Sequence, residues 1–135
     1  IFIMHDAGYS PLNVARKVDQ GEISGIQILN NTFYNTTGAG NDAVKMTSVV
    51  NGLVVDNVSI GYADFAQISG GGVTLSKNVS SGPYGMVDYV NFNFHLTSNS
   101  PLINAGIDDG LRDDFDGTSR PQGTSMDIGA FEYKP

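Results

Sequence analysis

The chain has 135 residues, the size of one domain with a single hydrophobic core. Its 7 Lys and Arg residues stand against 14 Asp and Glu residues, and the net charge of −7 excludes phosphate-tracking binding of nucleic acid and disfavours polyanionic substrates. The absence of Cys excludes disulfides, thiolate zinc sites and a cysteine nucleophile. With 40% apolar and 16% charged residues, the composition is that of a folded domain.

The first four residues, IFIM, are apolar but far too few to cross a bilayer, and no basic segment precedes them. We therefore expect no membrane partner. The run resembles the middle of a strand, which suggests that the chain is part of a longer polypeptide. Residues 11–20 are the one segment for which we expect a helix, because Pro11 suits a first turn and Leu12, Ala15 and Val18 recur near helical spacing.

Short segments rich in Val, Ile and Leu repeat along the rest of the chain, separated by turns that contain Gly and Asn. One pattern occurs as GIQILN at 25–30, GLVVDN at 52–57 and GVTLSKN at 72–78, the last with one extra residue. A second occurs as DAVKMTS at 42–48 and DFAQISG at 64–70, 22 residues apart. Alternation predicts the following interior side chains: Ile26, Ile28, Leu53, Val55, Val73 and Leu75 in the first pattern, and Val44, Met46, Ala66 and Ile68 in the second.

Two short strands per period of about 20 to 27 residues, with no room for crossover helices, indicate a solenoid of stacked β-coils. The chain has room for about four or five such coils, and we expect an all-β fold. Asn30, Asn57 and Asn78 occupy the same place in each repeat and are predicted to form a ladder at one turn. Each also begins an Asn-x-Ser/Thr sequon, which offers glycosylation as the other interpretation.

The last third of the chain carries a more distinctive pattern: FHLTSNSPLINAG at 94–106, DFDGTSRP at 114–121 and DIGAFEY at 127–133. It resembles the closing segment of secreted bacterial right-handed parallel β-helix proteins. The resemblance implies one right-handed parallel β-helix domain over 1–135, with coils in 1–93 and the final coil and a capping tail in 94–135. It implies a secreted protein but no particular activity, because such tails close lyases, hydrolases and binding modules alike.

A capping tail would cover the unpaired edge of the last coil. The apolar residues available for this are Ile103, Ile107, Ile128, Phe131 and Tyr133. Arg120 can clamp a carboxylate with its fixed fork of donors, and Asp116, Asp127 and Glu132 are its candidate partners. We therefore expect Arg120 and Asp127 to be structural.

Residues for catalysis are sparse. His5 stands beside Asp6 without an apparent nucleophile, and His95 lies inside the tail pattern, where we expect a structural contact. No catalytic residue is predicted. Carboxylates at 108–109 and 113–116 offer oxygen ligands that suit Ca²⁺, but their spacing is not that of an EF-hand. We predict a solvated loop there and no cofactor or metal, with calcium as the alternative.

The coils instead carry aromatic and polar groups of the kind that bind neutral glycans without chemistry. Tyr62 and Tyr84 are 22 residues apart, the spacing of the second repeat, which predicts a column beside Lys45 and Gln67. The expected ligand-binding residues are Tyr62, Tyr84, Tyr89, Gln67, Lys45 and Asp88. Burial of the tyrosine rings in the core is the competing interpretation.

Three functions compete. The leading expectation is a non-catalytic carbohydrate-binding module for a neutral or weakly charged plant polysaccharide, with xylan first because the fold resembles the β-helix binding modules of bacterial xylanases. Its partners would be the polysaccharide and a covalently linked catalytic domain. The alternatives are the C-terminal part of a polysaccharide lyase or glycoside hydrolase, and a structural or adhesin repeat.

Overall fold

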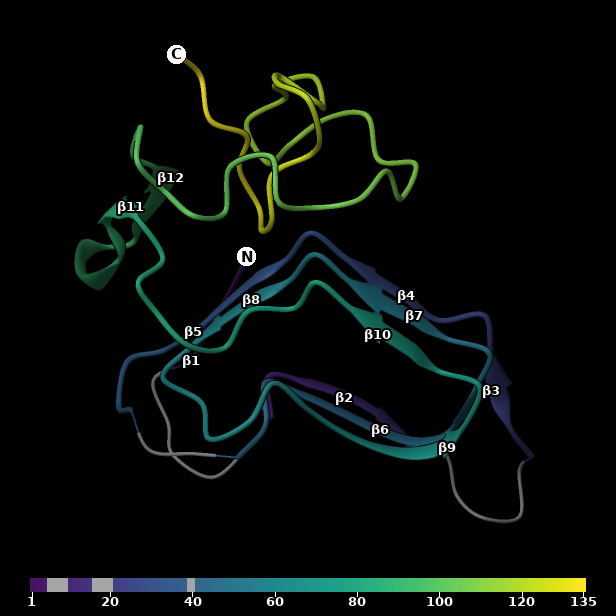
Figure 1. The fold of residues 1–135 in the computed structure, drawn as a ribbon. Coiled ribbons are helices and arrows are strands. Elements are labelled where there is room, and N and C mark those ends of the chain that lie inside the picture. Colours follow the sequence, from purple (N-terminus) through teal and green to yellow (C-terminus); the bar gives the residue numbers. More distant parts are fainter. Residues whose placement is uncertain (5–9, 16–20, 39–40) are drawn as a thin grey trace.

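The computed structural model describes residues 1–4, 10–15, 21–38 and 41–135, and these residues form an all-β structure (Figure 1). The strands up to Ser76 pair in parallel in three sheets, none of which closes into a barrel. The described residues include one short 3-10 helix, η2 (Tyr89–Asn91), and no helix long and apolar enough to cross a membrane.

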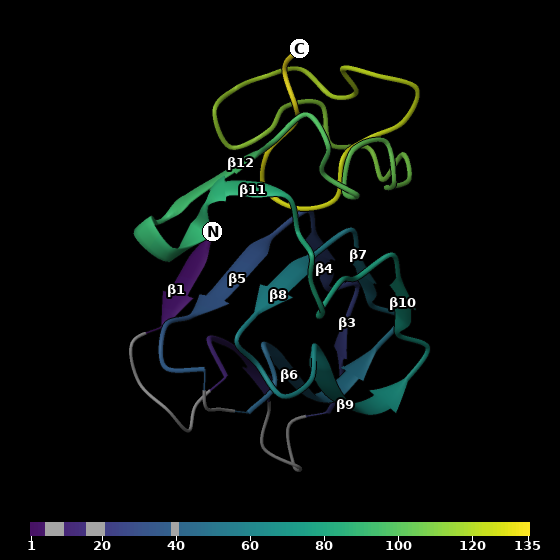
Figure 2. The same ribbon diagram turned by 60° about the vertical axis from the view of Figure 1, so that its left-hand side comes forward.

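The three sheets are built from successive passes of the chain. The first has the order β1-β5-β8 (Phe2–Met4, Thr32–Asn35, Val58–Ile60), and Figure 2 shows these strands side by side. The second has the order β4-β7-β10 (Gln27–Leu29, Leu53–Val55, Thr74–Ser76). In the third, β6 (Val44–Val50) pairs on one side with β2 (Leu12–Ala15) and β3 (Ile23–Ser24), and on the other with β9 (Ala66–Gly71).

A hydrophobic core fills the space that the three sheets surround (Figure 1). Its buried members are Ile28, Phe33, Ala43, Val44, Met46, Val49 and Val54. Val44 pairs with Ala66 and Met46 with Ile68, so the interior alternation predicted for the second repeat is confirmed. Burial of these side chains removes apolar surface from water. For a fully buried Val or Met, such as Val44 and Met46, this stabilises the fold by about 1.5–3 kcal/mol.

The middle copy of the first repeat is shifted by one residue from the prediction, while Ile26, Ile28 and Val73 lie in or against the interior core as predicted. Ile28 pairs with Val54, and Val54 with Leu75, so Val54 lies in the interior core, while Leu53 is half-buried and Val55 is fully buried outside that cluster. A shift of one residue turns every side chain of a strand to the other face. Leu75 continues this interior column but is 47% exposed, because β10 is the last strand of its sheet.

The expected helix over 11–20 is wrong where the structure describes it. Leu12–Ala15 is the strand β2, which pairs in parallel with β6 through Leu12 opposite Val44 and Val14 opposite Met46. Leu12 and Val14 pack against the core and Asn13 is exposed, a period of two that the helical spacing of Leu12 and Ala15 obscured. Residues 16–20 lie outside the described part.

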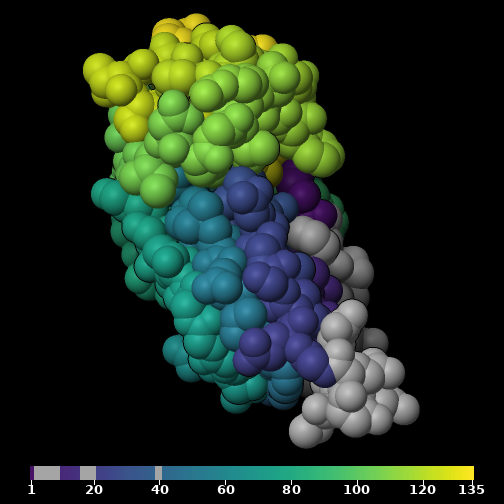
Figure 3. All heavy atoms as spheres, turned by 90° about the vertical axis from the view of Figure 1, so that its right-hand side faces the viewer, coloured from purple at the N-terminus to yellow at the C-terminus, as the bar shows by residue number. Residues whose placement is uncertain are grey.

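The C-terminal residues pack against the outside of the parallel sheets. β11 (Met86–Asp88) and β12 (Asn93–Leu96) form an antiparallel hairpin, and the loops of 97–135 form a separate mass beside the coil body (Figures 1 and 3). A second core lies beneath them, formed by Tyr34, Val58, Ile60, Phe94, Leu96, Leu102, Ile128, Ala130 and Phe131. The tail therefore covers the outer face of β5 and β8, which corrects the expectation that it closes the open end of the stack.

Candidate functional site

The outer face of the β2-β6-β9 sheet carries a row of polar side chains. Asn13 is opposite Lys45, and Lys45 is opposite Gln67, and all three are exposed. Because neighbouring parallel strands lie about 4.8 Å apart, the row presents one polar group at each such step along the stack. In each of these strands, the residues before and after the row member point inward and pack in or against the interior core. Sequence reasoning placed Lys45 and Gln67 in one row but missed Asn13, since 11–20 was expected to be helical.

A hollow of about 360 Å³ lies at the far end of the same sheet. It is lined by Gly21, Glu22, Ser48, Ser69 and Gly70. Ser48 is a bulge in β6, with φ of 59°, where the pairing skips from Thr47 opposite Ser69 to Val49 opposite Gly70. Gly70 is required here, because a Cβ at this position would collide with the Val49 carbonyl. The bulge thus ends the flat row and opens the hollow beside it.

The three tyrosines do not join this row. Tyr62 packs against the interior core, its hydroxyl is buried without a hydrogen-bond partner, and burial raises its pKa to about 12. Tyr84 and Tyr89 pack on the tail-side core at a ring centroid distance of 6.1 Å. The column predicted for Tyr62 and Tyr84 beside Lys45 and Gln67 is therefore wrong, because the two tyrosines belong to different cores.

Tyr84 and Asp88 have structural partners on the tail side. The Tyr84 hydroxyl lies 3.2 Å from the carbonyls of both Ser59 and Ser80, which share its single proton as acceptors. Its pKa is raised by burial and by the neighbouring Tyr89. Asp88 caps η2 and accepts hydrogen bonds from the backbone N–H (3.3 Å) and side-chain amide (2.7 Å) of Asn91. Asp88 therefore lies on the hairpin, apart from Lys45 and Gln67.

The asparagine ladder is present, with Asn31 in place of Asn30. The Oδ1 of Asn57 accepts the backbone N–H of Asn31 (2.8 Å), and the Oδ1 of Asn78 accepts the backbone N–H (3.1 Å) and amide Nδ2 (2.9 Å) of Asn57. Asn30 instead shares a column with Asp56 and Lys77, all with φ of 50–56°, and its amide donates to Asp109 (3.1 Å). The sequence contained a sign of this alternative, because either Asn30 or the adjacent Asn31 can be aligned with Asn57 and Asn78.

Arg120 and its partners hold the tail together. Its guanidinium donates to Glu132 Oε1 (2.9 Å) and to the carbonyls of Asp127 (2.9 Å) and Gly129 (2.7 Å). The side chains of Arg120 and Glu132 are 1% and 0% exposed. Of the three candidate partners, Glu132 makes the ion pair, while Asp127 accepts the backbone N–H groups of Asn104 and Tyr133, both at 2.7 Å.

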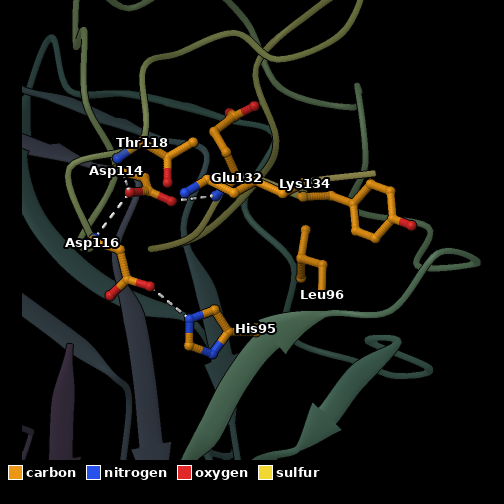
Figure 4. Close-up of a pocket in the computed structure, with 8 residues that line it drawn as sticks. His95, Leu96, Asp114, Asp116, Thr118, Glu132 and Lys134 are labelled. Atoms are coloured by element: carbon orange, nitrogen blue, oxygen red, sulfur yellow. Dashed lines mark hydrogen bonds and ion pairs between the residues drawn. The ribbon is translucent and has the colours of Figure 1, made fainter.

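A pocket of about 140 Å³ opens between β12 and the tail, and it contains the one histidine within the described residues (Figure 4). His95 Nε2 lies 2.7 Å from Asp116 Oδ2, and Nδ1 lies 2.7 Å from Asn93 Oδ1. The ring also packs on Phe131 at a centroid distance of 4.2 Å. These contacts tie the hairpin to the tail. His5 lies outside the described residues.

The remaining carboxylates of this pocket are occupied by protein donors. Asp114 accepts the backbone N–H groups of Asp116 (2.9 Å), Thr118 (2.7 Å) and Glu132 (2.9 Å) (Figure 4). Burial acts to raise the pKa of Asp114, but these donors outweigh it and hold the pKa below its ordinary value. Glu132 is bound to Arg120 and to the backbone N–H of Asp127. Asp114 and Glu132 are thus both engaged by donors of the protein itself.

Over the described ranges, no group of three or more His, Asp or Glu side chains is placed to hold a metal ion. In the segment for which calcium was the alternative, Asp108 accepts the backbone N–H of Gly110 and pairs with Arg112, each at 3.1 Å. Asp109 accepts the backbone N–H of Leu111 at 3.1 Å. Both carboxylates thus stabilise the local turn.

Scans against protein-family models, curated proteins and solved structures found no match. The resemblance of the tail therefore remains an expectation from its residues. The polar row, the hollow beside it and the pockets under the tail are the candidate binding sites among the described residues.

Proposed function

We propose that the chain is a non-catalytic carbohydrate-binding module with the fold of a right-handed parallel β-helix. Three parallel sheets visited in turn support the fold, since strand partners come from successive passes about 21 to 32 residues apart. Parallel crossover connections are right-handed in nearly all proteins. Secretion and a covalently linked catalytic domain belong to the same proposal.

The observation that carries the binding function is the exposed row Asn13, Lys45 and Gln67 on the β2-β6-β9 sheet. Amide and ammonium groups at a regular spacing can bond the hydroxyls of an extended polysaccharide, and the sheet holds them in place before the ligand arrives. Because the described residues place no aromatic ring beside the row, the contacts that they offer are polar and shallow. We expect micromolar to millimolar affinity.

The charge of the chain favours a neutral or weakly charged ligand. With a net charge of −7, a polyuronate would be repelled, and the row supplies one basic side chain, Lys45. Glu22 in the adjacent hollow adds to this preference. Xylan is the first ligand to test, and polygalacturonate is the matched charged comparison.

Affinity electrophoresis of the parent protein in gels with and without xylan tests the proposal. We expect xylan to retard the protein, polygalacturonate to have no effect, and neither reducing ends nor unsaturated products to appear. Gln67→Ala is expected to bind more weakly, whereas Gln27→Ala, an exposed glutamine on the β4-β7-β10 sheet, serves as the matched control. Equal retardation of both variants would remove the row as the site. Cleavage of xylan would replace the binding module with the lyase or hydrolase alternative.

A further inference from the structure

The end of the stack that β9 and β10 form is uncovered (Figure 1). Among the described residues, β9 pairs only with β6 and β10 pairs only with β7, so each has one edge without a strand partner. No residue from 61 to 80 is buried, whereas Val44 and Met46 of the preceding pass are. The last pass therefore exposes apolar surface together with unpaired backbone groups, and an added β-strand satisfies both.

This edge lacks the features by which proteins usually protect a free strand, which are charged residues, proline or a covering segment. Residues 65–76 contain no charged residue and no proline, in a chain whose net charge is −7. Leu75 is 47% exposed, and Ile68 and Val73 are half-buried against the interior core. The tail packs over β5 and β8 and leaves the edge open. The edge is thus suited to a partner that also presents an uncharged strand.

Opposite charges flank the uncharged run. Asp64 stands directly before it and Lys77 directly after it, and both residues are exposed. Neither makes an ion pair within the described residues. The run thus has a negative end and a positive end, and a second copy in antiparallel orientation is its electrostatic complement.

The alternation of side chains restricts how two such edges can pair. A two-fold axis near the turn between β9 and β10 lays β9 of one copy antiparallel to β10 of the other, and the reverse. Interior side chains must then face interior side chains, so Leu75 of one copy is opposite either Ala66 or Ile68 of the other. In the first register Asp64 is directly opposite Lys77 of the second copy. In the second it is diagonal to that residue, which a long side chain still reaches.

We propose that the edge formed by β9 and β10 binds a second copy of this chain, in a two-fold dimer that joins two stacks end to end. Each copy supplies the other with antiparallel strand partners, covers Leu75 and pairs Asp64 with Lys77. Because a two-fold arrangement uses the same surface of both copies, association stops at the dimer. The inference does not rest on carbohydrate binding, since Lys45 and Gln67 project from the face of the sheet and not from its edge.

Sedimentation equilibrium of the whole chain over roughly 1 µM to 1 mM tests the dimer. We expect the parent to change from monomer to dimer within this range. Leu75→Glu puts an unpaired charge into the apolar part of the interface and should weaken dimerisation at least about tenfold. Val90→Glu, at an apolar residue that is 61% exposed on the hairpin, is the matched control and should associate like the parent.

Charge reversal tests the register. Asp64→Lys brings two Lys side chains together across the interface, and Lys77→Asp brings two carboxylates together, so each should weaken dimerisation. The double variant Asp64→Lys/Lys77→Asp restores opposite charges and should dimerise like the parent. Circular dichroism of each variant checks the fold, and recovery in the double variant identifies a contact between copies.

The other outcomes overturn the proposal or a defined part of it. A parent that stays monomeric over the whole range contradicts the dimer, as does a dimer that Leu75→Glu leaves unchanged. A dimer that Val90→Glu disrupts moves the interface to the hairpin. Assemblies that grow beyond two copies contradict the two-fold arrangement, because they require the edge to bind the opposite end of the next stack. A double charge variant that stays as weak as the single variants rules out the pairing of Asp64 with Lys77.

Discussion

The Arg120→Ala variant tests how the tail is held. It removes the cation from an ion pair whose side chains are 1% and 0% exposed, and it strands Glu132 with two of its donors, the backbone N–H groups of Gln122 and Asp127. The carbonyls of Asp127 and Gly129 also lose a charged donor. Breaking one partner out of a buried pair costs about 3–5 kcal/mol. Since native domains are stable by about 5–15 kcal/mol, this loss is a large fraction of the total.

Equilibrium unfolding in urea measures this loss of unfolding free energy. Urea is uncharged, so it does not screen the ion pair as a salt would. Arg112→Ala is the matched control, because Arg112 pairs with Asp108 at 3.1 Å while both side chains are 64% or more exposed, and it should unfold like the parent. Hydrogen exchange of the Gly129 amide, which donates to the Asp56 carbonyl (2.8 Å), reports whether the tail stays on the coils. If Arg120→Ala and Arg112→Ala unfold at the same urea concentration, Arg120 does not hold the tail.

Other predictions concern the ladder and two carboxylates, the buried Asp56 and the half-buried Asp114. Asn57→Ala leaves the Asn31 N–H without its side-chain acceptor and removes the amide donor from the carbonyls of Ile28 and Val55, of which Val55 keeps the Asn30 N–H. It should cost about 1–3 kcal/mol in urea unfolding, more than Asn78→Ala at the end of the ladder. Burial raises the pKa of Asp56 above 3.8, so its stabilising contribution is present in acid and is lost as the pH rises through the folded-state value. Asp56→Asn should therefore unfold at higher temperature than the parent at pH 7, with a difference that shrinks toward pH 3. Asp114 has a lowered pKa and the opposite sign, so Asp114→Asn should be less stable at pH 7 and should match the parent in acid.

The all-β class and the repetition could be predicted because strand composition and turn residues are local properties. The second repeat was aligned correctly since its alternation, Val44 and Met46 against Ala66 and Ile68, admits one register. The first repeat was misaligned because the segments GIQILN and GLVVDN both begin with Gly and end with Asn, which favours pairing them end to end. Aligning Asn31 with Asn57 and Asn78 removes the extra residue that the third copy had required.

The left-handed backbone positions explain that register. Asn30, Asp56 and Lys77 share one column and a positive φ, so the turn after β4, β7 and β10 falls at the same step in the three copies. Asn and Asp adopt this conformation readily, and the Lys in the third copy hid the pattern from sequence reasoning. The tyrosines were misplaced for a different reason, since an equal spacing of 22 residues does not say which sheet a residue joins once the chain leaves the coils after Ser80.

Calorimetric titration with xylohexaose is the most direct test of the polar row on the β2-β6-β9 sheet. The parent and Gln27→Ala should bind alike, and the double variant Lys45→Ala/Gln67→Ala should bind about tenfold more weakly, because each lost contact to a hydroxyl is worth roughly 0.5–1.5 kcal/mol. Thermal unfolding of the double variant should match the parent, since both side chains are exposed. Equal affinity for all three proteins, or no heat of binding with the parent, would contradict the assignment of carbohydrate binding to this face.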